Sequence, residues 1–105
     1  MRARKNYHDD LMRDLKDPKV AVGYLNAAFE DHDRRVFLLA LRDVAQAWGG
    51  MTRLSRAAKI PRISLYKALS KEGNPEIHTV DNLLRAFGLR FVVAPDDPKL
   101  LRRAA

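Results

Sequence analysis

The stretch that decides the fold is MTRLSRAAKIPRISLYKALSKEGNP, residues 51–75. It holds two short runs with helical spacing of apolar residues, separated by Lys59-Ile60-Pro61. A helix, a three-residue turn and a second helix is the spacing of a helix-turn-helix, whose second helix enters the major groove of DNA. We therefore predict helices over residues 52–58 and 62–70, with Thr52 as the N-cap of the first.

The same stretch is strongly basic. Between Asp43 and Glu72 there is no acidic residue, and the six basic residues are Arg53, Arg56, Lys59, Arg62, Lys67 and Lys71. The chain of 105 residues has 20 Lys and Arg against 13 Asp and Glu, so these six account for most of its formal charge of +7. A local positive field suits a polyanion, because binding neutralises phosphates and releases counterions. Charge and helix spacing together favour binding of double-stranded DNA.

The second helix has the two faces that this interpretation demands. An inward apolar face is formed by Leu65, Ala68 and Leu69. The opposite, outward face carries Ile63, Tyr66, Lys67 and Ser70. Arg62 lies in the first turn, where the helix dipole also favours a phosphate group.

These positions predict specific contacts with DNA. Arg62 can form a bidentate pair with guanine, and Ile63 suits a thymine methyl group. Flanking polar residues such as Lys71 would hold phosphates, which fix register without reading sequence. Tyr66 could instead pack against the edge of the core, and Ile63 could contact a partner subunit. The predicted DNA-binding residues are Thr52, Arg53, Arg62, Ile63, Ser64, Tyr66, Lys67, Lys71 and Asn74.

Three further helices and one strand are predicted around the motif. One helix opens at Asp17-Pro18, a capping residue followed by proline at the first helical position. The next covers about residues 34–48, with Asp33 placed to cap it. The last is capped by Thr79. Residues 89–94 alternate and indicate a short strand, which must pair with residues near the N-terminus or with its copy in a second subunit.

The predicted fold class is all-α, a helix-turn-helix bundle of about five helices with one short C-terminal strand. Residues 1–16 are assigned to an N-terminal arm, 17–94 to a single helical domain that includes two N-terminal helices, and 95–105 to a C-terminal tail. The longest apolar run, residues 36–41, is far too short to span a membrane. No apolar segment follows the basic N-terminus, so no signal peptide is expected. The chain has no cysteine. We expect a cytoplasmic protein.

The motif resembles that of a known family. Residues 51–55 (Met-Thr-Arg-Leu-Ser), 62–70 (Arg-Ile-Ser-Leu-Tyr-Lys-Ala-Leu-Ser) and 73–75 (Gly-Asn-Pro) resemble the addiction-module antidote proteins. These are HigA-like antitoxins with a lambda-repressor-like (XRE) helix-turn-helix domain. The resemblance covers roughly residues 17–94. It implies a homodimer that represses its own promoter and neutralises a small toxin of the RelE/ParE type encoded beside it.

The sequence departs from the family pattern at three positions. Lys59 stands where the turn usually has glycine, and a left-handed lysine costs about 1 kcal/mol or more. Pro61 stands where serine usually precedes the recognition helix; proline can start a helix but cannot cap it with its side chain. Ser55 replaces the common alanine in the helix before.

No catalytic, cofactor-binding or metal-binding residue is predicted. The three histidines, His8, His32 and His78, lack ligand spacing. The protein is therefore expected not to be an enzyme. Two other functions stay open: a phage-type transcriptional repressor without a toxin partner, and a protein-interaction adaptor that uses the helix-turn-helix as scaffold.

Acidic residues gather only in the N-terminal third of the chain. They are Asp9, Asp10, Asp14 and Asp17, and then Glu30, Asp31 and Asp33. A cationic toxin would be attracted to this part of the chain. Taken singly, these residues are better explained as helix caps and solvated turns.

Overall fold

The computed structural model describes residues 3–96, with side chains from residue 7 onward. Six helices and no strand are found in this part of the chain. The helices are α1 (Ala3–Asp14), α2 (Pro18–Glu30), α3 (Arg34–Ala47), α4 (Gly50–Ala58), α5 (Arg62–Ala68) and α6 (Ile77–Ala86). The first two residues of the predicted arm and residues 97–105 of the predicted tail lie outside the described residues.

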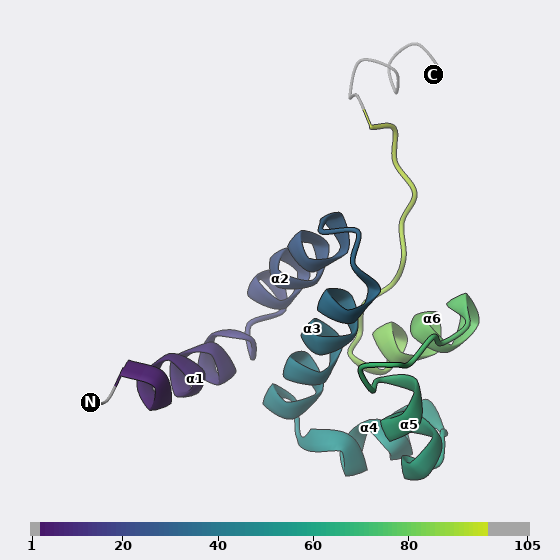
Figure 1. Ribbon diagram of the computed structural model, residues 1–105, viewed down its shortest axis with the longest axis horizontal. Helices are drawn as coiled ribbons and strands as arrows, with labels where there is room; N and C mark the ends of the chain where they lie inside the picture. Colours follow the sequence, from purple (N-terminus) through teal and green to yellow (C-terminus); the bar gives the residue numbers. More distant parts are fainter. Residues whose placement is uncertain (1–2, 97–105) are drawn as a thin grey trace.

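Helix α3 is the centre of the arrangement (Figure 1). It packs against α1, α2 and α4, while α4 in turn packs against α5 and α6. Helices α4 and α5 therefore lie at the opposite end of α3 from the α2–α3 connection. The all-helical fold class is confirmed by this arrangement, with one helix more than the sequence predicted.

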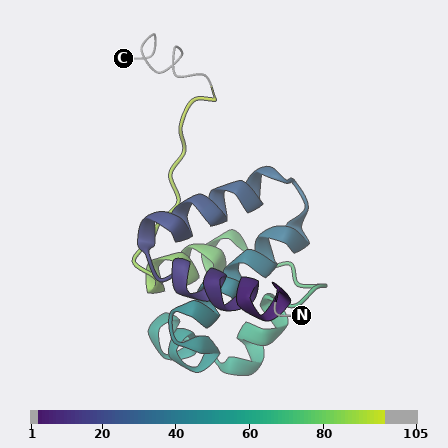
Figure 2. The same ribbon diagram turned by 90° about the vertical axis from the view of Figure 1, so that its left-hand side faces the viewer.

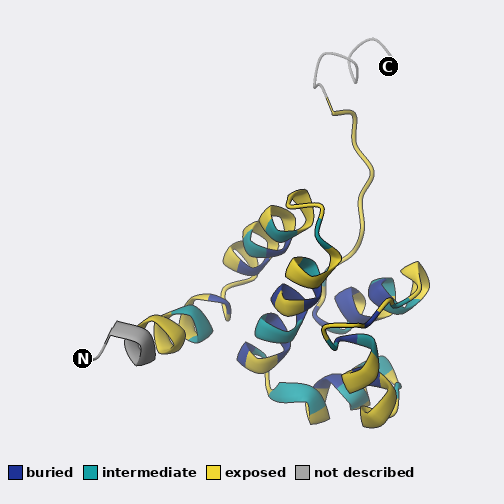
Figure 3. Cartoon of the chain, in the orientation of Figure 1, coloured by how far each residue is buried: buried dark blue, intermediate teal, exposed yellow. Residues whose placement is uncertain are grey.

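A single apolar cluster joins all the helices (Figure 3). Its largest members that are shielded almost completely from solvent are Leu15, Leu38, Leu41, Val44, Leu65, Leu69 and Leu83. Because these residues come from the α1–α2 junction, α3, α5 and α6, the helix-turn-helix and the N-terminal helices share one core. Their burial removes apolar surface from water, which is the main favourable contribution to folding.

The predicted starts of α2 and α3 are confirmed. The Asp17 side chain accepts a hydrogen bond from the backbone N–H of Lys19, and Pro18 occupies the first helical position. The Asp33 side chain likewise accepts from the backbone N–H of Arg35. Both bonds satisfy donors that the first turn of a helix would leave free. The side-chain and backbone hydrogen bonds from Arg35 lower the pKa of Asp33.

Helix α1 was not predicted, since the sequence analysis assigned residues 1–16 to an arm. Its polar sequence has few apolar residues, and only Leu11 and Met12 of its described side chains pack against the core. Leu15, just after the helix, is fully buried. The segment folds against the other helices because these three residues add apolar side chains to the core.

Two other helix starts differ from the prediction. Helix α4 begins at Gly50 with Gly49 as its N-cap, so the assignment of Thr52 as N-cap was wrong. Both glycines have positive φ, 118° and 86°, which side-chain-bearing residues rarely adopt, so the chain turns from α3 directly into α4. Helix α6 begins at Ile77 with Glu76 as N-cap, three residues before the predicted cap Thr79.

The predicted strand at 89–94 is not confirmed. No strand is assigned in residues 3–96, and Phe91, Val92 and Val93 are exposed. A strand needs a partner for its backbone groups. The N-terminal residues from Ala3 to Asp14, one of the two expected partners, form a helix instead.

Two side-chain hydrogen bonds attach the N-terminal helices to α3. The indole Nε1 of Trp48 donates to the backbone carbonyl of Leu15 at 2.5 Å. The phenol of Tyr24 donates to Asp43 at 2.6 Å. Burial, followed by this hydrogen bond and the charge of Asp43, raises the pKa of Tyr24.

Candidate nucleic-acid interface

The turn between α4 and α5 is held by the end of α4 itself. The backbone carbonyl of Ser55 accepts hydrogen bonds from the N–H groups of Lys59 and Ile60. The Ser55 hydroxyl also donates to the carbonyl of Ile60 at 2.5 Å, a bond that an alanine at this position could not make. Lys59 adopts the left-handed conformation with φ 58° and ψ 42°, as its place in the motif predicts.

Helix α5 has the two faces that the sequence predicts. Leu65 and Leu69 are fully buried. On the other side Ile63 is 83% exposed and Tyr66 51% exposed. A large aliphatic side chain so open to solvent contributes nothing to the core, so it is available for contact with another molecule. Tyr66 does not pack into the core edge.

Arg62 and Tyr66 form a pair on the surface of α5. The Arg62 guanidinium lies 5.6 Å from the centre of the Tyr66 ring, and one of its nitrogens donates to the phenol oxygen at 3.3 Å. A cation over an aromatic ring is attracted by the electrons of its face. The Arg62 side chain is therefore restrained near the outer face of α5 rather than free in solvent.

Five of the other predicted contact residues are exposed. Ser64 and Lys67 are exposed on α5, and Lys71 and Asn74 are exposed in the segment that follows it. Thr52 is exposed in the first turns of α4. Ser70, predicted on the outward face, is half-buried, and its hydroxyl donates to the carbonyl of Lys67.

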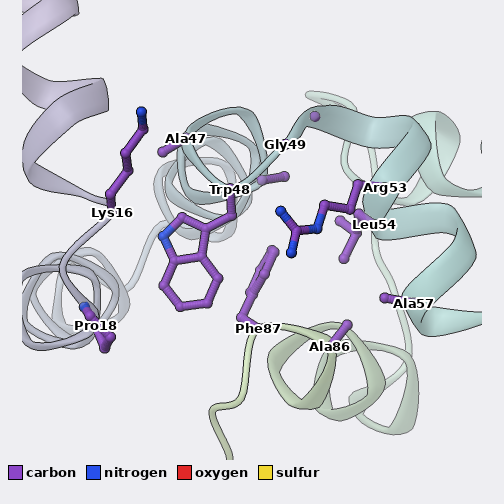
Figure 4. Close-up of a pocket in the computed structure, with 12 residues that line it drawn as sticks. Lys16, Pro18, Ala47, Trp48, Gly49, Arg53, Leu54, Ala57, Ala86 and Phe87 are labelled. Atoms are coloured by element: carbon purple, nitrogen blue, oxygen red, sulfur yellow. The ribbon is translucent and has the colours of Figure 1, made fainter.

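Arg53 lies differently from the rest of the set. Its side chain extends over a cavity of about 480 Å³ between the end of α3, the start of α4 and the end of α6 (Figure 4). The guanidinium is directed toward the rings of Trp48 and Phe87, which meet edge to face at 5.4 Å. The structure thus does not bring Arg53 together with the exposed side chains of α5.

The cavity was not foreseen from the sequence. Its lining includes two cations, Lys16 and Arg53, and no acidic residue. Nothing in the spacing of these residues indicates a cavity, because they come from three separate segments of the chain.

No group of three or more His, Asp or Glu side chains in residues 3–96 is arranged to hold a metal ion. Among the helices of this part of the chain, none combines the length and apolarity needed to cross a bilayer.

Comparison with known proteins gives one family and one relative. The family model described as "Probable addiction module antidote protein" matches residues 6–95. An uncharacterised protein of Haemophilus influenzae is 41% identical over 70 residues, which cover 67% of this chain and 71% of that protein. No solved structure matches the chain significantly. The matched span begins within α1 and ends after α6, so it includes both α4 and α5.

Proposed function

The chain belongs to the addiction-module antidote family, and from that premise we propose that it is a DNA-binding antitoxin. In this proposal it represses its own operon and neutralises a RelE/ParE-like toxin encoded beside it, both in the cytoplasm. It acts by binding and not by catalysis. The fold proposed for α3 to α6 is that of the lambda-repressor-like (XRE) domains of HigA-like antitoxins.

The observation that carries DNA binding is the outer face of α5. It presents Arg62, Ile63 and Lys67 to solvent within a segment that has no acidic residue between Asp43 and Glu72. Side chains on such a helix can reach base edges in the major groove, while nearby cations neutralise phosphates. Thr52, Lys71 and Asn74 are the proposed phosphate contacts, since they are exposed on either side of α5.

A homodimer is the proposed DNA-binding form. In a two-fold dimer the two α5 helices would lie about 34 Å apart, one turn of DNA, on a palindromic operator. The proposed dimer contact is residues 89–94, whose exposed Val92 and Val93 would pair with the same segment of a second copy. Residues 3–14, the other expected partner of this strand, form a helix. We therefore propose that the strand pairs with the same segment of a second copy.

The salt dependence of operator binding tests the DNA half of the proposal. If each subunit neutralises about four phosphates, a plot of log affinity against log salt has a slope of about −7 for the dimer. Fluorescence anisotropy with labelled promoter DNA measures it, and a scrambled duplex is the control. A slope close to zero with an intact circular dichroism spectrum would leave the adaptor interpretation instead.

The toxin half needs a separate measurement. The tagged chain is co-expressed with the untagged product of the small open reading frame beside its gene, and the neighbour is also expressed alone. We expect a stable complex and growth arrest by the neighbour alone. A harmless neighbour that forms no complex would leave a stand-alone repressor.

A further inference from the structure

The cavity beside Arg53 has no role in the proposed function. Its volume is about 480 Å³, and it lies where three segments meet: the α1–α2 connection, the end of α3 with the start of α4, and the end of α6. Figure 2 shows the α1–α2 connection on the side of the molecule where α6 ends, above α4. Sites for small molecules are typically cavities of a few hundred Å³ with mainly apolar side chains and a few charged groups.

One face of α4 forms a wall of the cavity. Its lining residues follow at the spacing i, i+3, i+4 and i+7, which puts them on the same side of the helix: Gly50, Arg53, Leu54 and Ala57. Thr52, a proposed phosphate contact, does not line the cavity and lies on the other side of α4. The cavity and that proposed DNA contact therefore occupy different sides of one helix.

Gly49 makes room for the Arg53 side chain along this wall. A Cβ at Gly49 would lie 2.5 Å from the Arg53 Cδ, so the arginine stem occupies space that any other residue would need. Gly49 also has a φ of 118°, which residues with a Cβ rarely adopt. The stem thus packs against the backbone before α4, and Figure 4 shows the guanidinium directed over the cavity.

The Arg53 guanidinium has no ion-pair partner among the described residues. Three ion pairs are formed in this part of the chain, and none includes Arg53: Arg13 with Asp10, Arg35 with Asp33, and Arg85 with Asp81. A guanidinium can form two parallel hydrogen bonds with one carboxylate. Arg53 is therefore available to an anionic group that enters the cavity.

Nearby carboxylates do not supply that group. Three of them lie within two residues of the lining, and none lines the cavity: Asp14, Asp17 and Asp43. Asp17 caps α2, and Asp43 accepts a hydrogen bond from Tyr24. The only charged side chains of the lining are the cations Lys16 and Arg53. Their field favours an anion over a neutral or cationic ligand.

The two cations are placed differently. In Figure 4 Lys16 lies on the other side of the Trp48 ring from Arg53, and its ammonium points away from the ring. The Arg53 guanidinium instead points toward the Trp48 and Phe87 rings. Arg53 is therefore the expected partner of the anionic group, and Lys16 adds positive charge at the rim.

Two aromatic rings form the side of the cavity that faces Arg53. Trp48 and Phe87 meet edge to face at 5.4 Å, and the bond from the Trp48 Nε1 to Leu15 fixes the orientation of the indole. Figure 4 looks onto the flat face of this indole, with the Arg53 guanidinium beside it. Aromatic rings pack well against such a pair, either offset or edge-on. A ligand that satisfies both features has a flat ring with an anionic group at its edge.

We propose that the cavity is a binding site for a small aromatic carboxylate, whose ring lies against Trp48 and Phe87 and whose carboxylate pairs with Arg53. The site goes beyond the antitoxin function and does not depend on it. DNA offers phosphates but no exposed ring of this kind. Because the ligand contacts the end of α3, the start of α4 and the end of α6 together, its binding stabilises the folded protein.

The single tryptophan provides the measurement. Its indole N–H gives one resonance in a proton–nitrogen correlation spectrum, and Trp48 lines the cavity. The probe is naphthoate; naphthylmethanol is the neutral analogue of similar shape, and acetate is a carboxylate without a ring. We expect a saturable shift with naphthoate at a Kd of about 1 mM or below. Naphthylmethanol should bind about tenfold more weakly, and acetate should cause no saturable shift.

Matched arginine variants test the role of Arg53. Arg53→Met keeps an unbranched stem beside Gly49 and removes the charge, while Arg56→Met changes an exposed arginine of α4 that does not line the cavity. Arg53→Met should weaken naphthoate binding by about tenfold or more and leave naphthylmethanol binding unchanged. Arg56→Met should change neither. If Arg53→Met fails to fold, Arg53→Gln gives the same comparison.

Several outcomes would overturn the site. They are equal affinities of the wild-type chain for naphthoate and naphthylmethanol, equal losses for Arg53→Met and Arg56→Met, and the absence of any saturable shift. Release of bound naphthoate by operator duplex would assign Arg53 to a DNA phosphate and would also overturn it. None of these results bears on toxin binding, so the antitoxin function stands or falls on its own experiments.

Discussion

The phenol oxygen of Tyr24 on α2 lies 2.6 Å from the Oδ2 of Asp43 on α3, and the phenol donates the hydrogen bond. This bond fixes how the two helices align. Tyr24→Phe removes the donor and keeps the ring, so we expect a loss of about 1 kcal/mol of unfolding free energy. Urea denaturation measures it. Tyr7→Phe, at a side chain 72% exposed, should change nothing.

The same tyrosine makes stability depend on alkaline pH. Its pKa in the folded protein is raised above the ordinary value of 10.0 by burial first and by Asp43 second. The folded state thus holds the phenol proton more tightly than the unfolded state. Its stabilising effect is complete below pH 10 and is lost as pH rises from there through the higher pKa of the folded state. The stability difference between wild type and Tyr24→Phe should therefore shrink above pH 10 in denaturation series.

Replacement by alanine should have opposite effects on stability at two glycines. A Cβ at Gly73 would meet the backbone of Ala68 at the end of α5, with the carbonyl carbon only 2.8 Å away. Gly73→Ala should cost about 1–3 kcal/mol, because the backbone must shift. Gly23 lies within α2 with nothing within 4 Å of the added Cβ, so Gly23→Ala should stabilise by about 0.5–1 kcal/mol. Thermal melts of the pair give both signs, and destabilisation by both would contradict the geometry.

Replacement of Lys59 by glycine should make the folded protein more stable. Its φ of 58° is costly for a residue with a Cβ and free for glycine. We expect Lys59→Gly to stabilise the protein by about 0.5–1 kcal/mol in urea denaturation. Arg56→Gly, inside α4, is the matched control and should destabilise by about 1 kcal/mol. A lower melting temperature for Lys59→Gly would mean that the lysine makes a compensating contact.

Arg62 and Lys71 should differ in what they do for DNA binding. Arg62→Ala is expected to cost about 1–3 kcal/mol on the operator and to relax specificity, because the role proposed for this side chain is to read a base. Lys71→Ala should weaken binding to all sequences alike, because a phosphate contact carries no sequence information. Anisotropy with operator and random duplexes separates the two. Equal losses on both duplexes for Arg62→Ala would contradict base reading.

Tyr66→Phe examines the pairing of Arg62 with its neighbour. It removes the phenol oxygen, 3.3 Å from the guanidinium, but keeps the ring beneath it. If the ring positions Arg62, operator affinity should fall by less than for Tyr66→Ala, since the cation–π contact is worth about 0.5–1 kcal/mol at an exposed site. Equal losses for the two variants would assign the effect to the hydroxyl.

Local sequence signals predicted the parts of the fold that depend on neighbouring residues. Asp17-Pro18 and Asp33 start helices because their side chains bond to backbone groups two residues on. The turn at Lys59 followed from helix spacing alone. Helix α1 and the start of α4 were missed for the converse reason. The packing of Leu11 against the core depends on segments distant in sequence, and the start of α4 depends on the positive φ of Gly49.

The candidate interface was predictable to a similar degree. Alternation of apolar and polar positions on one helix gave the burial of Leu65 and the exposure of Ile63. The direction of Arg53 was not predictable, because it depends on where Phe87 from α6 meets Trp48.

Trp48 is the only tryptophan of the chain, and its indole is bonded to the residue that joins α1 to α2. Its fluorescence therefore responds to detachment of the N-terminal helices from the rest, and also to loss of the contact between its ring and Phe87. If that detachment precedes global unfolding, the emission will change at a lower urea concentration than the far-ultraviolet ellipticity. A coincident transition would mean that all six helices form a single cooperative unit.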